Sequence, residues 1–255
     1  EVFSGERGGF DFVVMNPPYE RLKPNMAEFI RERLLSGDSS IHLNAFNNHK
    51  ARIREVSKYF RKSGEYTFST SYILNTYQLF IERALQLIRN GGSIGCIVPS
   101  TILCDVSAQN LRNALFLQNS MQVIDSFPET SRIFSGVTQA VSILTFTKGG
   151  STENFEAGFN RITLNDIHSE KRLLLNAKRM IETIGQSLMI PQVDKKGYAI
   201  LDLIHKCPSI FSSSNILVNR GELDLTIHRD LYSTERTKTP MIRGSQISRF
   251  ELVPG

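Results

Sequence analysis

The sequence predicts an α/β fold built on a mainly parallel sheet that ends in an antiparallel pair of strands. Residues 10–15 and 93–100 are apolar with little alternation, a pattern typical of parallel strands that are covered on both faces. Residues 71–92 lie between them and repeat apolar side chains at helical spacing, which is the order of a right-handed parallel crossover. The connection between the apolar runs 121–127 and 140–148 is too short for a helix, so we predict antiparallel neighbours there.

The segment 71–92 is the strongest helix prediction in the chain. Gly91 and Gly92 are expected to end this helix, because glycine commonly follows the last helical turn. Its predicted apolar face consists of Ile73, Tyr77, Phe80, Ile81, Ala84, Leu85 and Ile88. Three further helices are predicted from charged or amphipathic segments, at 26–35, 48–62 and 106–117.

The spacing of apolar residues predicts secondary structure less clearly after the strand predicted at 140–148. The segment "KGGSTEN" at 148–154 is rich in Gly, Ser and Asn, and we interpret it as a domain boundary. Beyond it, residues 166–187 and 197–207 are predicted to be helical, and from about residue 215 the chain is expected to form turns and short strands. The domain prediction is therefore one domain over 1–148 and a second part over 149–255.

Composition favours a folded, soluble protein. Of the 255 residues 40% are hydrophobic and 22% are charged, and the net charge of +5 permits a polyanionic partner. No apolar stretch approaches the roughly 18 residues that a membrane helix needs, and no signal peptide is evident. Three scattered cysteines fit a reducing cytoplasm and indicate no metal site. The chain opens without Met and closes just after a predicted strand begins, so an excised fragment is expected.

The tetrapeptide Asn16-Pro17-Pro18-Tyr19 follows the first predicted strand, at the end of the strand where open α/β sheets bind ligands. The side-chain oxygen of Asn16 and the carbonyl oxygen of Pro17 are both hydrogen-bond acceptors, and the two prolines hold them in a fixed relation. Two fixed acceptors suit an exocyclic amine, whose two protons they bind while its lone pair faces an electrophile. Tyr19 offers a flat ring on which a heterocycle stacks. The alternative is that the tetrapeptide is only a rigid turn.

Longer segments of the chain resemble a known enzyme family. "DFVVMNPPY" resembles the catalytic motif of class I S-adenosylmethionine-dependent amino-methyltransferases, whose sheet is Rossmann-like. "NTYQLFIERALQLIRNGGSIGCIVPSTIL" and "IFSGVTQAVSILTF" resemble later motifs of the gamma-class DNA adenine methyltransferases of type II and type IIG restriction–modification systems. "MIRGSQISRFEL" resembles the start of their target-recognition domain. The likeness covers residues 10–148, and 240–252 more loosely.

This resemblance implies roles for six residues. Asn16 and Pro17 would hold the amine of an adenine flipped out of duplex DNA, since the target nitrogen is unreachable inside the helix. Tyr19 would stack on that adenine, and Phe134 would contact its other side or edge. Pro18 and Phe80 would line the pocket for the adenine of the cofactor. Core packing is the alternative role for Phe80, and Asn75 and Tyr77 are interpreted as structural.

A basic segment lies between the catalytic motif and the helix at 71–92. Its cations are Lys50, Arg52, Arg54, Lys58, Arg61 and Lys62, against the single acid Glu55. They are candidates for contacts with DNA phosphates, in a region where the resembled family has a variable loop near DNA. A solvated helix face is the alternative.

The resemblance also implies what lies outside these residues. The family has a Gly-rich cofactor turn and an acidic residue upstream of its catalytic motif, whereas "SGERGG" at 4–9 stands at the wrong place in the order. Residues 1–148 are therefore expected to be the carboxyl-terminal part of a methyltransferase domain, and 149–255 a linker region with the start of a target-recognition domain. Such a chain is expected to bind S-adenosylmethionine poorly and to be inactive alone.

The expected partners are double-stranded DNA and the restriction or specificity parts of the same system, in a prokaryotic cytoplasm. No nuclease motif is evident. Two other functions stay open: a methyltransferase acting on RNA or on protein glutamine through the same motif, and a non-catalytic DNA specificity subunit. The long insert after Tyr19, the loop at Phe134 and the hundred residues beyond the sheet argue against the first, and the intact Asn16 argues against the second.

Overall fold

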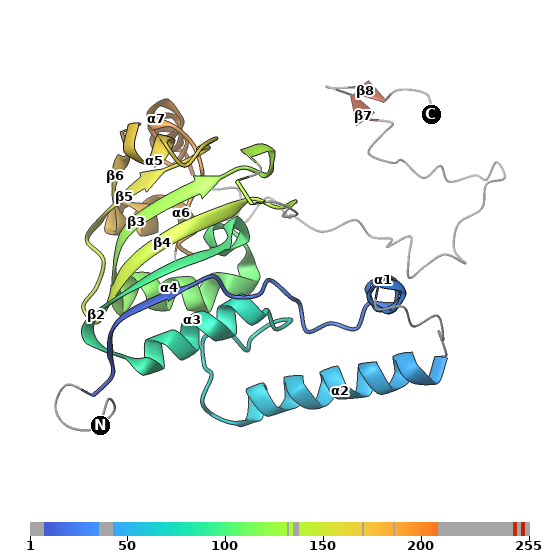
Figure 1. Cartoon of the computed structure of the whole chain (residues 1–255). Coiled ribbons are helices and arrows are strands. Elements are labelled where there is room, and N and C mark those ends of the chain that lie inside the picture. The colour runs from blue at the N-terminus through green and yellow to red at the C-terminus, as the bar shows by residue number, and fades with distance from the viewer. Residues whose placement is uncertain are drawn as a thin grey trace. The chain divides into compact units, whose positions relative to one another are not determined.

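The computed structural model describes residues 8–35, 43–131, 133–134, 138–169, 171–185, 187–208, 247–248 and 251–252. The chain divides into two compact units, Glu1–Cys207 and Pro208–Gly255. The first unit contains a six-stranded mixed sheet and its helices (Figure 1). Within the described part of the second unit there is a short antiparallel pair, β7 (Ile247–Ser248) and β8 (Glu251–Leu252). The predicted α/β class is confirmed.

The sheet has the order β1-β2-β4-β3-β5-β6. Its strands are β1 (Phe10–Met15), β2 (Ile88–Pro99), β3 (Asn119–Phe127), β4 (Val141–Lys148), β5 (Asn154–Gly158) and β6 (Leu173–Asn176). β1 is parallel to β2 and β3 is parallel to β5, whereas β4 runs antiparallel to both β2 and β3. The predicted antiparallel pairing of the strands at 121–127 and 140–148 is confirmed. β1, β2, β3 and β5 therefore point the same way, and their carboxyl ends share one edge of the sheet.

Most helices of the first unit lie at or near their predicted positions, and the segment 166–187 is an exception. The α-helices are α1 (Met26–Leu35), α2 (Leu43–Lys62), α3 (Thr76–Leu87), α4 (Gln109–Leu117), α5 (Asp166–Ser169), α6 (Ala177–Ile184) and α7 (Lys195–Ile204). Short 3-10 turns are η1 (Ser100–Leu103), η2 (Val106–Ala108) and η3 (Glu129–Ser131). Helices α3 and α4 lie against one face of the sheet (Figure 1), where apolar residues of α3, α4, α6 and the strands form one core.

One side of β1 is exposed in the described residues, and this corrects the prediction for the strand at 10–15. That strand was expected to be covered on both faces, but Phe12 is 75% exposed and Val14 is 87% exposed. Their neighbours Val13 and Met15 pack against the core on the other face. A run of apolar residues has the same sequence pattern in a strand covered on one face as in a strand covered on both, because burial depends on what packs against the strand.

The end of the main helix was also predicted wrongly. The helix α3 ends at Leu87, and the chain passes directly into β2, so Gly91 and Gly92 belong to the strand. The pairing between β1 and β2 is irregular there, because Phe10 pairs with Ile88 but Phe12 pairs with Ser93. Gly92 has no room for a side chain, since an added Cβ would lie 2.6 Å from the Ile88 side chain. These glycines serve a strand irregularity and not a helix cap.

Two predicted members of the helix face lie elsewhere. Ile73 precedes the helix, which begins at Thr76, and is 45% exposed. Phe80 lies within α3 but is 48% exposed, so packing in the core does not account for it. The other members of the predicted face, from Tyr77 to Ile88, are buried in the core.

The sheet continues beyond residue 148, where a domain boundary was predicted. The glycines of that segment form the turn into β5, which pairs with β3, and β6 then pairs with β5. The helix predicted over 166–187 is in fact α5, β6 and α6 in succession. Pairing with β5 decides this, since tertiary context overrides local helical pattern in a four-residue strand. The assignment of 149–255 to a linker and a recognition domain stays a prediction.

Candidate functional site

The residues from Asn16 to Tyr19 leave β1 at the edge of the sheet where the parallel strands end. Their side chains differ in exposure: Asn16 and Pro18 are exposed, Tyr19 is half-buried and Pro17 is buried. The next strand, β2, ends at Pro99 along the same edge, because β1 and β2 are parallel and in register from Phe12 to Met15. The tetrapeptide therefore lies at the edge where open α/β sheets bind ligands, and its catalytic role stays a prediction.

The Tyr19 hydroxyl fixes the orientation of the Asn16 carboxamide. It donates to Asn16 Oδ1 at 3.0 Å and to the backbone carbonyl of Ile97, in β2, at 3.1 Å. The single phenolic hydrogen is shared between these two acceptors. A carboxamide oxygen has two lone pairs, so Asn16 Oδ1 keeps an acceptor site in addition to the one that faces Tyr19. The structure thus holds the Asn16 oxygen at a defined position.

Burial raises the pKa of the Tyr19 phenol to about 12, and nearby Cys96 adds to the effect. The raised pKa means that the phenol keeps its proton over the whole neutral range and remains a hydrogen-bond donor. Its ring packs in part against the core. Tyr19 therefore has a positioning function that the sequence did not indicate, besides the flat ring that it offers for stacking.

The chain that follows the tetrapeptide is bonded to the start of α3. Thr76 Oγ1 donates to the Pro18 carbonyl at 2.6 Å and accepts from the Glu20 backbone N–H at 2.9 Å. The backbone adds a bond from Thr76 N–H to the Glu20 carbonyl at 2.9 Å and one from Leu22 N–H to the Leu74 carbonyl at 2.8 Å. Thr76 is a structural residue of the site that sequence patterns did not single out, since its role depends on two segments far apart in the chain.

Phe80 lies at an apolar cavity beside this junction. The cavity has a volume of about 310 Å³. It is lined by Leu22, Val56, Phe60, Tyr66, Thr76, Leu79, Phe80 and Arg83. Thr76 belongs to this lining and is bonded to the Pro18 carbonyl, but Pro18 itself does not line the cavity, so a joint role of Pro18 and Phe80 stays a prediction. The half-exposed ring of Phe80 and its aromatic neighbours provide flat apolar surfaces.

Phe134 lies in the connection between β3 and β4, on the same edge of the sheet as the tetrapeptide, and is half-buried. In sheet order, β2 and β4 stand between β1 and β3. Phe134 therefore lies on the same edge as the tetrapeptide with two strands between them, and its contact with a target base stays a prediction.

The six predicted phosphate contacts lie on α2, and they are not equivalent. Arg52, Arg54, Lys58, Arg61 and Lys62 are exposed, and Lys50 is half-buried. Arg61 donates from its two guanidinium nitrogens to the backbone carbonyls of Thr70 and Tyr72. The guanidinium of Arg61 is therefore committed to holding the segment before α3, which a count of charges in the sequence could not reveal.

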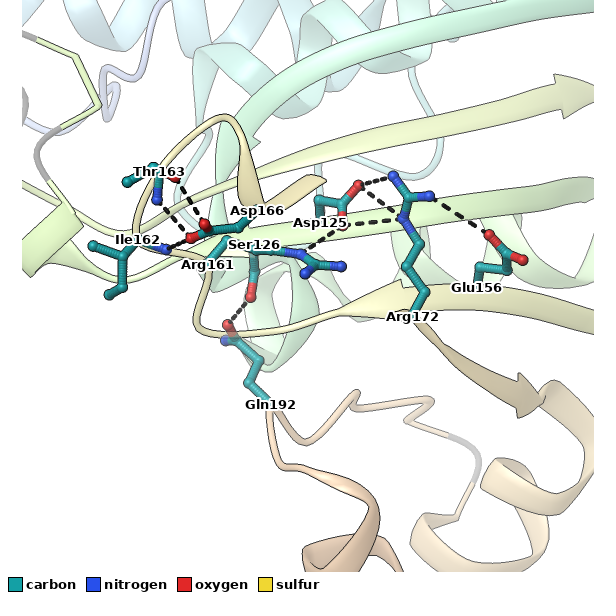
Figure 2. Close-up of polar contacts among 9 residues, drawn as sticks. All are labelled: Asp125, Ser126, Glu156, Arg161, Ile162, Thr163, Asp166, Arg172 and Gln192. Carbon is teal, nitrogen blue, oxygen red and sulfur yellow. Dashed lines mark hydrogen bonds and ion pairs between the residues drawn. The ribbon is translucent and has the colours of Figure 1, made fainter. Parts of the chain in front are cut away.

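A second polar cluster lies along the same edge, centred on Asp125 near the end of β3 (Figure 2). Arg172 donates to both carboxylate oxygens of Asp125, at 2.7 to 3.1 Å, and Arg161 donates to Asp125 at 3.2 Å. Arg172 also lies 3.7 Å from Glu156 of β5. The side chains of Asp125 and Arg161 are 3% and 1% exposed. The cluster fixes the long connection between β5 and β6 against β3, and sequence analysis missed it.

In the described parts of the chain, no group of three or more His, Cys, Asp or Glu side chains is arranged to hold a metal ion. None of the helices described there has the length and apolar character that crossing a bilayer requires.

Comparison with known proteins gives one family match. The model of the family described as "Eco57I restriction-modification methylase" matches residues 1–134. No curated protein matches the chain in a sequence search.

Several solved structures resemble the chain at low identity. The methyltransferase subunit of a type I restriction-modification system from Streptococcus thermophilus is 14% identical, with 76% of this chain and 41% of that chain covered and a TM-score of 0.45. The type IIG restriction endonuclease BpuSI is 15% identical over 80% and 23% of the two chains, with a TM-score of 0.44. The type ISP enzyme LlaGI, solved with a DNA substrate mimic, is 16% identical over 75% and 19%, with a TM-score of 0.43.

The chain spans less than half the length of each of these three structures, and similarity at this level says nothing about activity. The family match is of a different kind, since it covers 134 of the 255 residues and includes the Asn16–Tyr19 tetrapeptide, α3 and β2. The chain belongs to the Eco57I restriction-modification methylase family.

Proposed function

We propose that this chain carries the catalytic loop of an adenine-specific DNA methyltransferase of the gamma class, acting in a restriction–modification system. Membership of a restriction-modification methylase family supports methyl transfer to DNA. The position of the Asn16 side chain is the observation that favours an exocyclic amine as the methyl acceptor. Its carboxamide oxygen is exposed at the ligand-binding edge of the sheet and is held there by the Tyr19 hydroxyl.

The proposed chemistry needs only positioned acceptors. Asn16 Oδ1 and the Pro17 carbonyl accept the two protons of the adenine amine, which raises electron density on nitrogen and directs its lone pair outward. The amine then attacks the methyl group of the bound donor in line. The nitrogen–carbon bond forms as the carbon–sulfur bond of the donor breaks, the sulfur leaves with that electron pair as a neutral thioether, and the proton that the amine loses passes to solvent. Holding the nucleophile in place supplies much of the rate enhancement, since effective molarities of oriented groups are large. No strong base is required.

S-Adenosylmethionine is the proposed methyl donor and supplies an electrophilic methyl group when bound. The fit to the described residues is partial. The cavity at Phe80 has flat aromatic walls and about 310 Å³, which suits an adenine ring, and it adjoins Pro18 through Thr76. The chain's proposed contribution to the cofactor is therefore Pro18 and Phe80, at the adenine end.

The exposed side of β1 supports the proposal that this chain works with further polypeptide. β1 is an edge strand, and its exposed Phe12 and Val14 lie on the uncovered face beside the catalytic loop. Exposed apolar side chains on an edge strand mark a surface that another segment covers. We propose that the part carrying the remaining cofactor motifs packs there, and that the chain alone is inactive.

The proposed partner is duplex DNA, with the target adenine flipped out of the stack. Tyr19 is half-exposed and Phe134 is half-buried on the same edge of the sheet, which is compatible with two rings that hold one base. The cations of α2 add the positive charge that a phosphate backbone attracts.

The test measures transfer of a tritiated methyl group from S-adenosylmethionine by the full product of the gene. Duplex DNA, ribosomal RNA and cell protein serve as parallel substrates, and the labelled DNA is digested to nucleosides. We expect label on the exocyclic amine of adenine. Label on cytosine would contradict the adenine assignment, and label only on RNA or protein would overturn the proposal. Binding to DNA with no label on any substrate would favour a specificity subunit.

Replacing Tyr19 with Phe separates its hydroxyl from its ring. We expect the rate constant for methyl transfer to fall about tenfold, because loss of one hydrogen bond worth about 1 to 1.5 kcal/mol frees the Asn16 carboxamide to rotate. The KM for DNA should change little, since the ring remains. Tyr19→Ala, which also removes the ring, should raise KM as well. Equal kinetics for Tyr19→Phe and the wild type would show that the hydroxyl does not position Asn16.

A further inference from the structure

The structure contains a basic groove three residues beyond the catalytic tetrapeptide. One wall is formed by Leu22 and Pro24, and the other by the carboxyl-terminal half of α2. The groove has a volume of about 330 Å³. Its lining residues are Leu22, Pro24, Ile53, Arg54, Ser57, Lys58, Arg61 and Lys62. We refer to this set as the α2 groove.

The first wall of the α2 groove is held in place by the catalytic loop itself. Leu22 N–H donates to the Leu74 carbonyl at 2.8 Å. Glu20 is joined to Thr76 by three hydrogen bonds, and the Thr76 hydroxyl also donates to the Pro18 carbonyl. The path from Tyr19 to Leu22 is therefore fixed by backbone hydrogen bonds. A group bound in the α2 groove is held at a defined distance from Asn16.

The second wall carries unbalanced positive charge. Arg54, Lys58, Arg61 and Lys62 line it, and no acidic side chain is among the lining residues in the described part of the chain. Lys58 has only a 4.0 Å contact with Glu55, and both of these side chains are mainly exposed. Such a contact neutralises little charge. The groove therefore favours an anion.

The guanidinium group of Arg61 holds one of these positive charges at a fixed position. Its guanidinium donates to the carbonyls of Thr70 and Tyr72, which are neutral, so its positive charge is fixed in place and not cancelled. Arg61 thus attracts an anion through its electrostatic potential without bonding to it, while Arg54, Lys58 and Lys62 are the cations available for direct contact. Leu22 and Pro24 of the first wall, with Ile53 of α2, give the groove apolar surface beside these charges.

A groove that combines apolar surface with a row of cations matches a sugar–phosphate backbone, in which apolar sugar surface alternates with anionic phosphate. From this geometry we infer that the α2 groove binds the DNA strand that carries the target base, at phosphates next to the flipped nucleotide. This inference rests on the proposed function. Four of the six cations of α2 line the groove, namely Arg54, Lys58, Arg61 and Lys62, whereas Lys50 and Arg52 do not.

The division provides a charge-matched test. The double variants Arg54→Gln/Lys58→Gln and Lys50→Gln/Arg52→Gln each remove two positive charges from the same helix. Binding of the 255-residue chain to a fluorescent DNA duplex is measured by anisotropy between about 50 and about 200 mM salt. Circular dichroism of both variants confirms that the helix content is unchanged.

We expect the slope of log K against log salt to fall by about 1.8 for the groove variant, at about 0.9 per phosphate contact. The loss of affinity over this salt range should accordingly be about tenfold smaller for the groove variant than for the wild type. The Lys50→Gln/Arg52→Gln variant should keep a slope close to that of the wild type.

Equal slope changes in the two variants would show a diffuse charge effect and would overturn the inference. So would an unchanged slope in the groove variant, stronger competition by an RNA duplex of the same sequence, or displacement of DNA by millimolar inorganic phosphate. The slope is measured without methyl transfer. Failure of the proposed chemistry would appear in the methylation assay alone, whereas failure of the groove would appear in the slope alone.

Discussion

Replacement of Asn16 with Ala should lower the rate constant for methyl transfer to DNA by about 10²–10³-fold, the range found when one preorganised hydrogen-bonding group is removed from an active site. The substitution deletes the acceptor that Tyr19 holds at 3.0 Å and leaves the amine bound at one side only. The side chain of Asn16 is exposed at the sheet edge, so its loss should leave the fold intact. Single-turnover methyl transfer with labelled cofactor measures the effect.

Asn16→Asp is the matched control for that substitution. It keeps an oxygen acceptor of the same size at the same position, and the Tyr19 hydroxyl can donate to it as it does to the carboxamide. We therefore expect Asn16→Asp to retain much more activity than Asn16→Ala. Wild-type rates in Asn16→Ala would show that this side chain does not hold the amine, and the proposed function would then fail.

Replacement of Asp125 with Asn should destabilise the fold by about 3–5 kcal/mol, the cost observed when one partner of a buried ion pair is removed. Asp125 accepts from two arginines, and the side chain of Arg161 is only 1% exposed (Figure 2). Without the carboxylate, Arg161 and Arg172 both lose a charged hydrogen-bond acceptor in a largely buried cluster. The connection from β5 to β6 should also loosen. Urea unfolding followed by circular dichroism gives the change in free energy of unfolding.

Two further variants test this explanation. Glu156→Gln alters the outer end of the same cluster, where Glu156 is 54% exposed and 3.7 Å from Arg172, so it should cost less than about 1 kcal/mol. Gly158→Ala should be destabilising without any change of charge, because its Cβ would lie 2.2 Å from Arg161 Nη2 and 2.5 Å from Asp125 Oδ1. A free energy of unfolding for Asp125→Asn within about 1 kcal/mol of the wild type would contradict a stabilising role for the cluster.

The regular elements were predictable where their patterns are local. The strands at 93–100, 121–127 and 140–148 are apolar runs between turn residues, and they appear as β2, β3 and β4. The ends of β3 and β4 differ little from the prediction, whereas β2 begins at Ile88, inside the segment predicted as helix. The pairing of β3 with β4 followed from the length of their connection. Local pattern and chain length are sufficient for such features, because neither depends on distant residues.

Elements decided by distant residues were not predictable. β6 stands inside a segment with helical pattern and is a strand only because Leu173–Asn176 pairs with β5. The apolar strand β1 has an exposed side because the described helices cover the other face of the sheet. In both cases the residues are compatible with two outcomes, and packing selects one of them.

The candidate site divides in the same way. By itself the sequence determined the types of chemical group and their order: an amide and a carbonyl acceptor after a strand, an aromatic ring beside them, and a basic segment that follows. The tertiary structure decided how these groups are used. In the folded chain the Tyr19 hydroxyl donates a hydrogen bond to Asn16, and Arg61 donates to backbone carbonyls. Asp125 forms ion pairs with two arginines from beyond residue 148. The physical reason is that each of these contacts joins residues brought together by folding, and hydrogen bonds and ion pairs depend on distances that a one-dimensional pattern does not contain.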